Sequence, residues 1–178
     1  MDDIYFYGKK DGYYEFSNYS PCKFVIDGVE YISVEQYYQA QKFYYGDMDE
    51  ITEEYYNLMI ECDSPQKSKS MGSQREHRFG EKWFINKKKP HLGLMNDTIR
   101  KYAKAKMNPN WENEKDNVMF TGLYYKFSTN RNLKNLLIGT GSKRIHENSP
   151  KDMYWGVLGK DMLGILLCEI REKLVSEV

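Results

Sequence analysis

Residues 34–43 read VEQYYQAQKF, a run without glycine or proline that is rich in the helix formers Gln, Ala, Lys and Glu. A β-rich segment, residues 24–32, precedes it, and the intervening Ser33 is a favourable N-cap residue. The next chain break is Gly46-Asp47. We therefore predict a helix that begins after Ser33 and contains this whole run.

In such a helix Glu35, Gln39 and Lys42 are spaced i, i+4 and i+7 and share one face, with Tyr38 beside them. A carboxylate, a carboxamide, a phenol and an amine on one rigid element can hold and protonate a polar ligand. Polar residues at this spacing are also typical of a solvated helix face, and Glu35 suits any first helical turn. The spacing alone leaves both interpretations open.

Composition narrows the class of protein. The chain has 178 residues, of which 40% are hydrophobic and 29% charged, with a formal net charge of zero at pH 7. The length suits one domain with its own core, and the balanced charge is unlike that of a nonspecific nucleic-acid binder. No apolar run is long enough to span a membrane, and the cysteines lack metal-type spacing. We expect a cytoplasmic protein with free thiols, no metal, no cofactor and no loss of turnover in a chelator.

Hydrophobic spacing and turn signals predict the other elements. A strand at residues 4–7 and a hairpin at 23–31, turning at Asp27-Gly28, would form a small antiparallel sheet near the N-terminus. Helices are expected at residues 51–62, 65–72, 112–127, 132–138 and 162–175. Met71 is the only large apolar side chain of helix 65–72, so we expect it at the surface. The sum is a mostly helical α+β single domain, residues 1–178.

Residues 73–110 show the weakest pattern. They contain the basic turn Lys87-Lys88-Lys89-Pro90 and a helix-compatible stretch, residues 94–105. A solvated connector or insertion is the favoured interpretation. The alternative is a lid or a partner-binding segment whose lysines meet nucleic-acid phosphates.

Two loops combine polar and aromatic residues: Phe16-Ser17-Asn18, and the segment DMYWG at residues 152–156. Trp and Tyr in a loop can stack on a base or close a ligand pocket, and they can equally plug the core. With the Glu35 face, the two loops would supply three walls of a polar-aromatic pocket.

These blocks occur in the order of a known family. The sequence resembles the NADAR superfamily, also called YbiA-like, from about Tyr5 to Leu174. The most specific block is Glu-x-Tyr-x-Gln-Ala-x-Lys-Phe at residues 35–43. The other matching blocks are Phe6-Tyr7, Phe16-Ser17-Asn18, Ser64-Pro65, Met71-Gly72, Trp111, Tyr154-Trp155-Gly156 and Leu163-Gly164.

The resemblance implies a YbiA-like fold and an N-glycosidase, a hydrolase that cleaves ribose C1 from an exocyclic amine. We expect removal of ADP-ribose from ADP-ribosylated guanine in nucleic acid or nucleotides, with nucleic acid as a carrier of the substrate. The first alternative is hydrolysis of phosphoribosylaminopyrimidine intermediates of riboflavin synthesis. The second is a non-catalytic module that binds ADP-ribose or NAD. No membrane partner is expected.

The resemblance also assigns roles to residues. Glu35 is the expected general acid and base, and Lys42 the expected nucleophile, which would form a Schiff base with the opened ribose. That role requires a lowered Lys42 pKa, which partial burial under aromatic rings would provide. A direct oxocarbenium route, with Lys42 pairing with a phosphate, is the alternative. The residues expected to bind substrate are Tyr7, Gly8, Phe16, Ser17, Asn18, Tyr38, Gln39, Asp152, Tyr154, Trp155 and Gly156.

Two positions depart from the family's usual residues. Gln36 stands where a His often follows the central Glu, so a His proton relay cannot operate there. Asp161 stands where many members have Asn, and we expect its charge to shift substrate preference near a phosphate-bearing ligand.

Overall fold

The computed structural model describes residues 3–72, 101–102 and 104–177, so most of the predicted insertion or lid at 73–110 lies outside the described residues. In chain order the elements are β1 (Ile4–Phe6), the 3-10 helix η1 (Tyr14–Phe16), β2 (Phe24–Ile26), β3 (Val29–Tyr31), α1 (Val34–Gln41), α2 (Glu50–Ile60), α3 (Pro65–Gly72), α6 (Trp111–Thr129), α7 (Arg131–Ile138), β4 (Ile145–Glu147) and α8 (Met162–Ser176).

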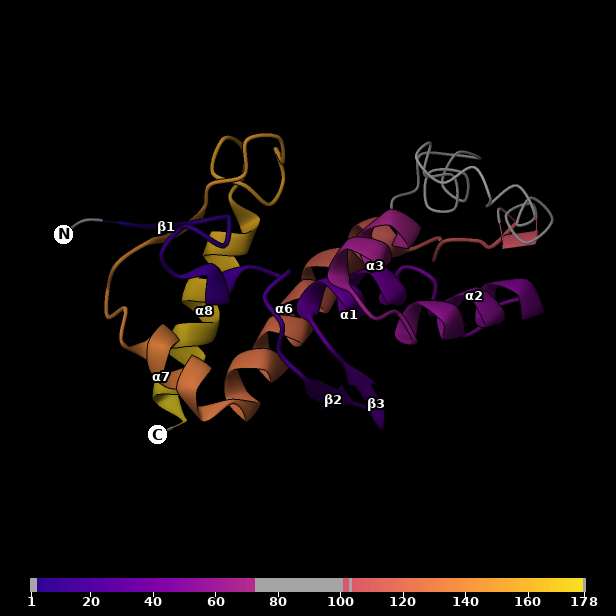
Figure 1. Ribbon diagram of the computed structural model, residues 1–178, viewed down its shortest axis with the longest axis horizontal. Helices are drawn as coiled ribbons and strands as arrows, with labels where there is room; N and C mark the ends of the chain where they lie inside the picture. The colour runs from indigo at the N-terminus through magenta and orange to yellow at the C-terminus, as the bar shows by residue number, and fades with distance from the viewer. Residues whose placement is uncertain (1–2, 73–100, 103, 178) are drawn as a thin grey trace.

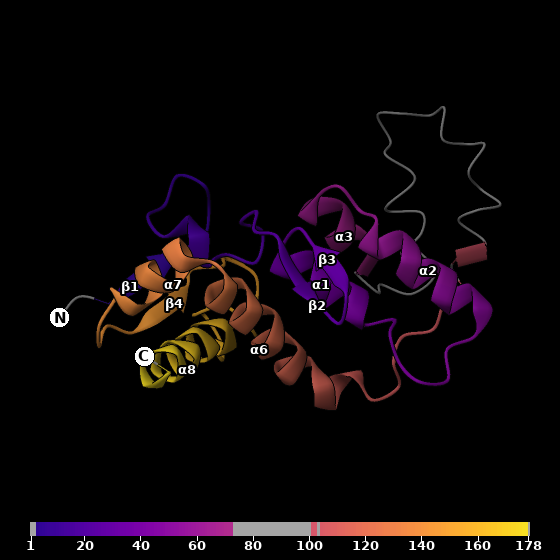
Figure 2. The same cartoon turned by 90° about the horizontal axis from the view of Figure 1, so that it is seen from below.

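Helix α6 runs through the middle of the molecule and joins two groups of elements (Figure 1). Helices α1, α2 and α3 and the β2–β3 hairpin lie toward one end, and α7, α8 and the β1–β4 pair toward the other (Figure 2). Gly122 allows α6 to approach α1 closely, because a Cβ there would lie 2.7 Å from a ring carbon of Tyr37. The mostly helical α+β prediction is confirmed.

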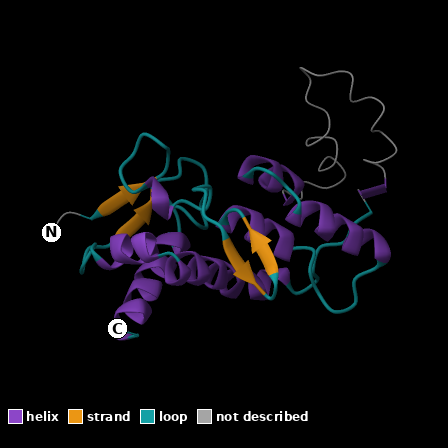
Figure 3. Ribbon diagram, turned by 60° about the horizontal axis from the view of Figure 1, so that its bottom comes forward, coloured by secondary structure: helices purple, strands orange, loops and turns teal. Residues whose placement is uncertain are grey.

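The strands form two separate two-stranded sheets (Figure 3). The β2–β3 hairpin is antiparallel as predicted, and Asp27 and Gly28 at its turn have φ angles of 50° and 80°. Strand β1 does not join this hairpin but pairs in parallel with β4, Ile4 opposite Ile145. Strand β4 was not predicted, because Ile145-His146-Glu147 contains one apolar residue and is not joined to its partner by a hairpin turn.

Helix α1 is the buried centre of one group. Its start is as predicted, since the Ser33 Oγ accepts a hydrogen bond of 3.1 Å from the Gln36 N–H. Every residue from Val34 to Ala40 is buried, so the interpretation of a solvated polar face is wrong. The helix ends at Gln41, one residue before Lys42, which occupies the C-cap position.

Gln36 has a structural role, which explains why a polar side chain can be buried at this position of α1. Its Oε1 accepts a hydrogen bond from the Ile32 N–H at 2.8 Å. Its Nε2 faces carbonyl oxygens at the end of α2, those of Met59, Ile60 and Cys62, at 2.9 to 3.2 Å. The carboxamide therefore satisfies helix-terminal acceptors that would otherwise be buried without a donor.

Helix α3 packs against α1, and the expectation that its Met71 lies at the surface is wrong. Met71 is fully buried, and not at the surface. Its carbonyl oxygen accepts a hydrogen bond of 3.1 Å from the Tyr55 hydroxyl, and its sulfur lies 3.2 Å from the Cys62 Sγ. In the described part of the chain, no helix combines the length and the apolar character needed to cross a membrane.

Candidate active site

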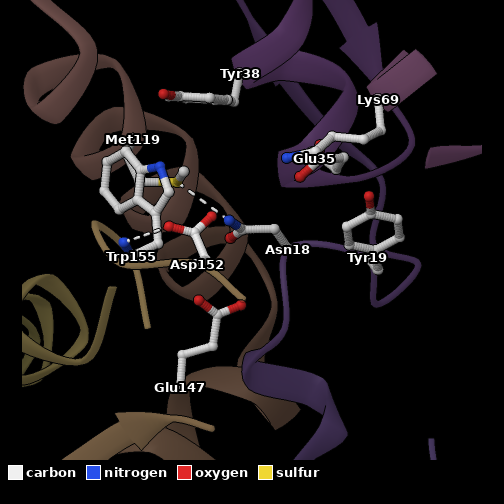
Figure 4. A pocket seen from close by; sticks show the side chains of 9 residues that line it. All are labelled: Asn18, Tyr19, Glu35, Tyr38, Lys69, Met119, Glu147, Asp152 and Trp155. Atoms are coloured by element: carbon white, nitrogen blue, oxygen red, sulfur yellow. Dashed lines mark hydrogen bonds and ion pairs between the residues drawn. The ribbon is translucent and has the colours of Figure 1, made fainter. Parts of the chain in front are cut away.

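A narrow cavity of about 50 Å³ lies beside α6 and takes its walls from both groups of elements (Figure 4). A space of this size admits a few water-sized groups, so it suits the reacting part of a ligand and not a whole nucleotide. The lining residues come from the loop after η1, α1, α3, α6, β4 and the loop before α8. They are Asn18, Tyr19, Glu35, Tyr38, Lys69, Met119, Glu147, Asp152 and Trp155.

Glu35 is held in one orientation. Only 3% of the residue is exposed, and its Oε1 accepts a hydrogen bond of 2.7 Å from the Gln39 Nε2. The Lys69 Nζ lies 3.6 Å from the same oxygen. The Glu35 N–H donates to the Asn18 carbonyl at 3.0 Å, which ties the first turn of α1 to the loop that carries Asn18.

The position of the Gln39 side chain depends on Gly72. A Cβ added at Gly72 would lie 1.9 Å from the Gln39 Oε1, a distance no side chain can tolerate. Helix α3 therefore approaches α1 closely at this point only because residue 72 has no side chain. The contact places Lys69, one turn earlier on α3, beside Glu35.

Two aromatic rings, those of Tyr38 and Trp155, line the cavity. Trp155 meets Tyr38 edge to face, with ring centroids 5.5 Å apart, and Tyr38 meets Trp111 in the same way at 5.0 Å. Burial raises the pKa of Tyr38, so its phenol stays neutral. The Asp152 Oδ1 accepts the N–H groups of Tyr154 and Trp155 at 3.0 and 2.9 Å and thereby fixes the loop.

Glu147 lines the cavity from β4, and its carboxyl group points toward Asp152 and Asn18 (Figure 4). Burial, and then the charges of Asp152 and Glu35, raise the pKa of Glu147 to about 7. Within the described ranges, its buried Oε2 has no hydrogen-bond partner. Near neutral pH this carboxyl group can therefore both carry and release a proton.

Lys42 lies behind Tyr38. Its Nζ donates to the Gly72 carbonyl at 3.1 Å and sits 5.3 Å from the centroid of the Tyr38 ring and 5.8 Å from that of Trp111. Its pKa is lowered to about 8, first by burial and then by the charge of Lys69. The direction agrees with the sequence-based expectation, but Lys42 does not belong to the lining of the cavity that Glu35 faces.

Of the residues expected to bind substrate, four line the cavity beside Glu35: Asn18, Tyr38, Asp152 and Trp155. Two more lie directly behind it. Gln39 orients Glu35, and the Ser17 Oγ accepts a hydrogen bond of 3.2 Å from the Tyr19 N–H.

The remaining expected residues lie elsewhere. Phe16 is fully buried in the core, 5.8 Å from Phe6 between ring centroids. Tyr7 is 46% exposed, and the neighbouring Gly8 N–H donates to the Asp11 carboxylate. None of Phe16, Tyr7 and Gly8 is part of the cavity lining.

In the DMYWG loop, only two of the expected residues reach the cavity. The Tyr154 hydroxyl donates to the carboxylate of Asp116 at 2.9 Å instead. Gly156 shapes the loop, because its N–H donates to the Asp152 carbonyl and a Cβ would lie 2.6 Å from that oxygen. Its role is therefore to permit the turn that presents Trp155.

Four lining residues were missed from the sequence: Tyr19, Lys69, Met119 and Glu147. Tyr19 follows Asn18 directly, so the aromatic loop already carried a signal for it. Lys69 and Met119 sit in helices whose spacing gave no reason to single them out. Glu147 belongs to the missed strand β4, five residues before Asp152.

Asp161 does not line the cavity, although its charge was expected near the ligand. One carboxylate oxygen lies 2.5 Å from the His146 Nδ1, and the other accepts the Glu147 N–H at 3.3 Å. Asp161 therefore supports the strand that carries Glu147.

Comparison with known proteins agrees with this fold. The NADAR domain model matches residues 5–175. The N-glycosidase YbiA of Escherichia coli is 32% identical over 178 residues, 98% of this chain and 89% of that protein. The N-glycosidase Npun_R5314 of Nostoc punctiforme is 27% identical, covering 96% of this chain and 92% of that protein. The NMR structure of E. coli YbiA superposes with a TM-score of 0.72 at 30% identity, covering 99% and 88% of the two chains.

The chain belongs to the NADAR domain family. Within it, the chain is a member of the YbiA-like N-glycosidases.

Proposed function

We propose that this protein hydrolyses the bond between ribose C1 and an exocyclic amine, removing ADP-ribose from ADP-ribosylated guanine in nucleic acid or nucleotides. The observation that carries the proposal is the buried Glu35 carboxylate, fixed by Gln39 and Lys69 and open to a cavity walled by Trp155 and Tyr38. A fixed carboxylate activates water, and flat rings stack on a base. The relatives named N-glycosidase support the reaction class.

The mostly negative charge around the cavity favours a nucleobase over a phosphate group at its centre. Glu35, Glu147 and Asp152 line it together with one cation, Lys69. Carboxylates accept hydrogen bonds from the N–H groups of an aminopyrimidine ring and repel phosphate. The glycosidic bond would therefore lie inside, and the phosphates of ADP-ribose outside it.

Lys42 is the proposed nucleophile of a Schiff-base route. A pKa of about 8 leaves a useful neutral fraction at physiological pH. Because Lys42 lies behind Tyr38, the opened ribose must reach it along the Tyr38–Trp111 side of the site. Borohydride added during turnover should trap a ribosyl adduct in the wild type and in Lys126→Met, and none in Lys42→Met. Active wild-type enzyme without any adduct would favour the direct oxocarbenium route.

A second candidate substrate has support of its own. The maize riboflavin biosynthesis protein PYRR is 28% identical over 98% of this chain, which spans 26% of that protein. Phosphoribosylaminopyrimidines carry the same C1–amine bond, so the same residues would cleave them. A module that only binds ADP-ribose or NAD would need neither Glu35 nor a lysine of lowered pKa.

The deciding assay presents guanine-ADP-ribosylated DNA and a phosphoribosylaminopyrimidine to the wild type and to Glu35→Gln. We expect release of ADP-ribose from the DNA by the wild type and a loss of about 10³-fold in Glu35→Gln. Cleavage of the pyrimidine alone would reassign the substrate to riboflavin intermediates. Binding of ADP-ribose without any cleavage would identify a non-catalytic module.

A further inference from the structure

We propose that Glu147 is the general acid of this site, the group that protonates the leaving amine, while Glu35 acts as the base for water. The inference deepens the proposed N-glycosidase function and rests on it. It divides between two carboxyl groups the two proton transfers that the sequence had assigned to Glu35 alone.

Position is the first reason. Glu147 and Glu35 line the same cavity from different elements, β4 and α1. In Figure 4 the Glu147 carboxyl group points toward Asp152 and Asn18, and Glu35 lies on the Lys69 side. A glycosidic bond held between them would have one carboxyl group near the leaving nitrogen and the other near the attacking water, as two-carboxylate glycosidases require.

Hydrogen bonding separates their roles. Glu35 accepts a hydrogen bond from the Gln39 Nε2 and forms an ion pair with Lys69, so two donors face its Oε1. The Glu147 Oε2 is buried and has no partner among the described residues, so a proton on it remains available to a ligand. A buried carboxyl group without a donor nearby is stabilised in its neutral form.

The charges around Glu147 also favour its protonated form. Burial contributes most to the raised pKa of Glu147, about 7, and the facing carboxylates outweigh the single facing ammonium group. The titratable groups around Glu147 are Asp152, Glu35, Asp161, Lys69 and Tyr19. An acid that titrates near 7 is matched to proton transfer at neutral pH.

The step is balanced. The Glu147 proton passes to the exocyclic nitrogen as the C1–N bond breaks, and the bonding pair stays on nitrogen, so the amine leaves neutral. In the proposed Schiff-base route the Lys42 Nζ is already bonded to C1, so departure of the amine leaves C1 as an iminium of Lys42. Water then adds to C1, its proton goes to Glu35, and the C1–Nζ bond breaks as the sugar is released. Exchange with solvent returns a proton to Glu147 and removes the one on Glu35.

The test compares Glu147→Gln with Glu169→Gln, the same chemical change at an exposed position on α8. On guanine-ADP-ribosylated DNA and on the phosphoribosylaminopyrimidine, Glu147→Gln should lower kcat by about 10² to 10⁴-fold, with little change in KM. The wild type should lose activity on the alkaline side of its pH profile as Glu147 ionises, and Glu147→Gln should lack that fall. Wild-type activity in Glu147→Gln, or low activity that keeps the alkaline fall, would overturn the assignment.

A second measurement does not depend on turnover. In the free wild-type protein, the side-chain carboxyl ¹³C resonance that is missing from the Glu147→Gln spectrum should titrate near pH 7. A midpoint below pH 5 would overturn the assignment even if neither substrate were cleaved, whereas inactivity with a midpoint near 7 would count against the proposed substrates alone.

Discussion

Two lysines of lowered pKa lie in different regions of this protein, and only one adjoins the candidate site. Lys42, at the end of α1, contacts Tyr38, Trp111 and the Gly72 carbonyl. Lys126, on α6, is fully buried, and its Nζ donates to the Ser17 carbonyl at 2.8 Å. Burial lowers the pKa of each to about 8.

The two regions differ in what the amine can reach. Lys126 is sealed beneath the loop of Ser17 and Asn18 and holds that loop in place. Lys42 is partly exposed and lies one aromatic ring away from the cavity. A lowered pKa therefore does not by itself identify a catalytic lysine, because the amine must also have access to a substrate.

The largest expected effect separates the two lysines by activity. Lys42→Met should lower kcat by at least about 10³-fold on the wild type's substrate, because it removes the proposed nucleophile. Lys126→Met should lower it by less than about 10-fold, because it loosens only a supporting contact. Circular dichroism would confirm that both variants are folded. Equal losses of kcat in the two variants would show that Lys42 is no more important for catalysis than Lys126.

A smaller effect is expected from the glycine that borders Lys42. Gly72→Ala should displace Gln39 and the Gly72 carbonyl, lowering kcat by about 10-fold and the free energy of unfolding by about 1–3 kcal/mol. Gly46→Ala is the matched control, because a Cβ at Gly46 meets nothing within 4 Å. Steady-state kinetics and urea unfolding would measure both. An unchanged Gly72→Ala would show that the α1–α3 contact does not govern the site.

The smallest expected effect is a pH dependence of the free energy of unfolding, to which Lys42 and Lys126 should both contribute. The folded pKa of each, about 8, lies below the ordinary value of 10.5, so between these values the unfolded chain binds more protons and the free energy of unfolding rises with pH. From pH 8 to 9.5 each lysine should contribute about 1.5 kcal/mol.

The comparison of variants isolates that contribution. Over this pH range the wild type should gain about 1.5 kcal/mol relative to Lys126→Met, and a similar amount relative to Lys42→Met, by urea unfolding. Cys22 and Cys62, whose pKa values burial raises, act in the opposite direction but are present in all three proteins. A constant difference between wild type and Lys126→Met would mean that its amine titrates normally.

Much of the fold could be predicted from local signals. The Ser33 cap, the Asp27-Gly28 turn and the apolar spacing of α8 each act within a few residues, so the sequence shows them directly. Strand β4 could not be found, because its pairing with β1 joins residues about 140 positions apart in the chain and depends on tertiary packing.

The candidate site also contains residues that the sequence predicted and residues that it did not. Glu35 and Trp155 were predicted from a specific family block and an aromatic loop, whereas Lys69 and Glu147 had no such signal. Helical spacing placed Lys42 on the face of Glu35 and Gln39, and its helical backbone keeps it there, since Gln39 and Lys42 both meet Gly72. Spacing could not show that the cavity beside Glu35 ends before it reaches Lys42.

The sequence by itself determined the family, the helical α+β class and the central carboxylate, since these depend on local composition and on one specific motif. Only the tertiary structure decided which charges surround that carboxylate. Burial and neighbouring charge, which set the protonation of Glu147, Lys42 and Lys126, arise where segments distant in sequence meet. A sequence lists the titratable groups, and the folded chain sets their pKa values.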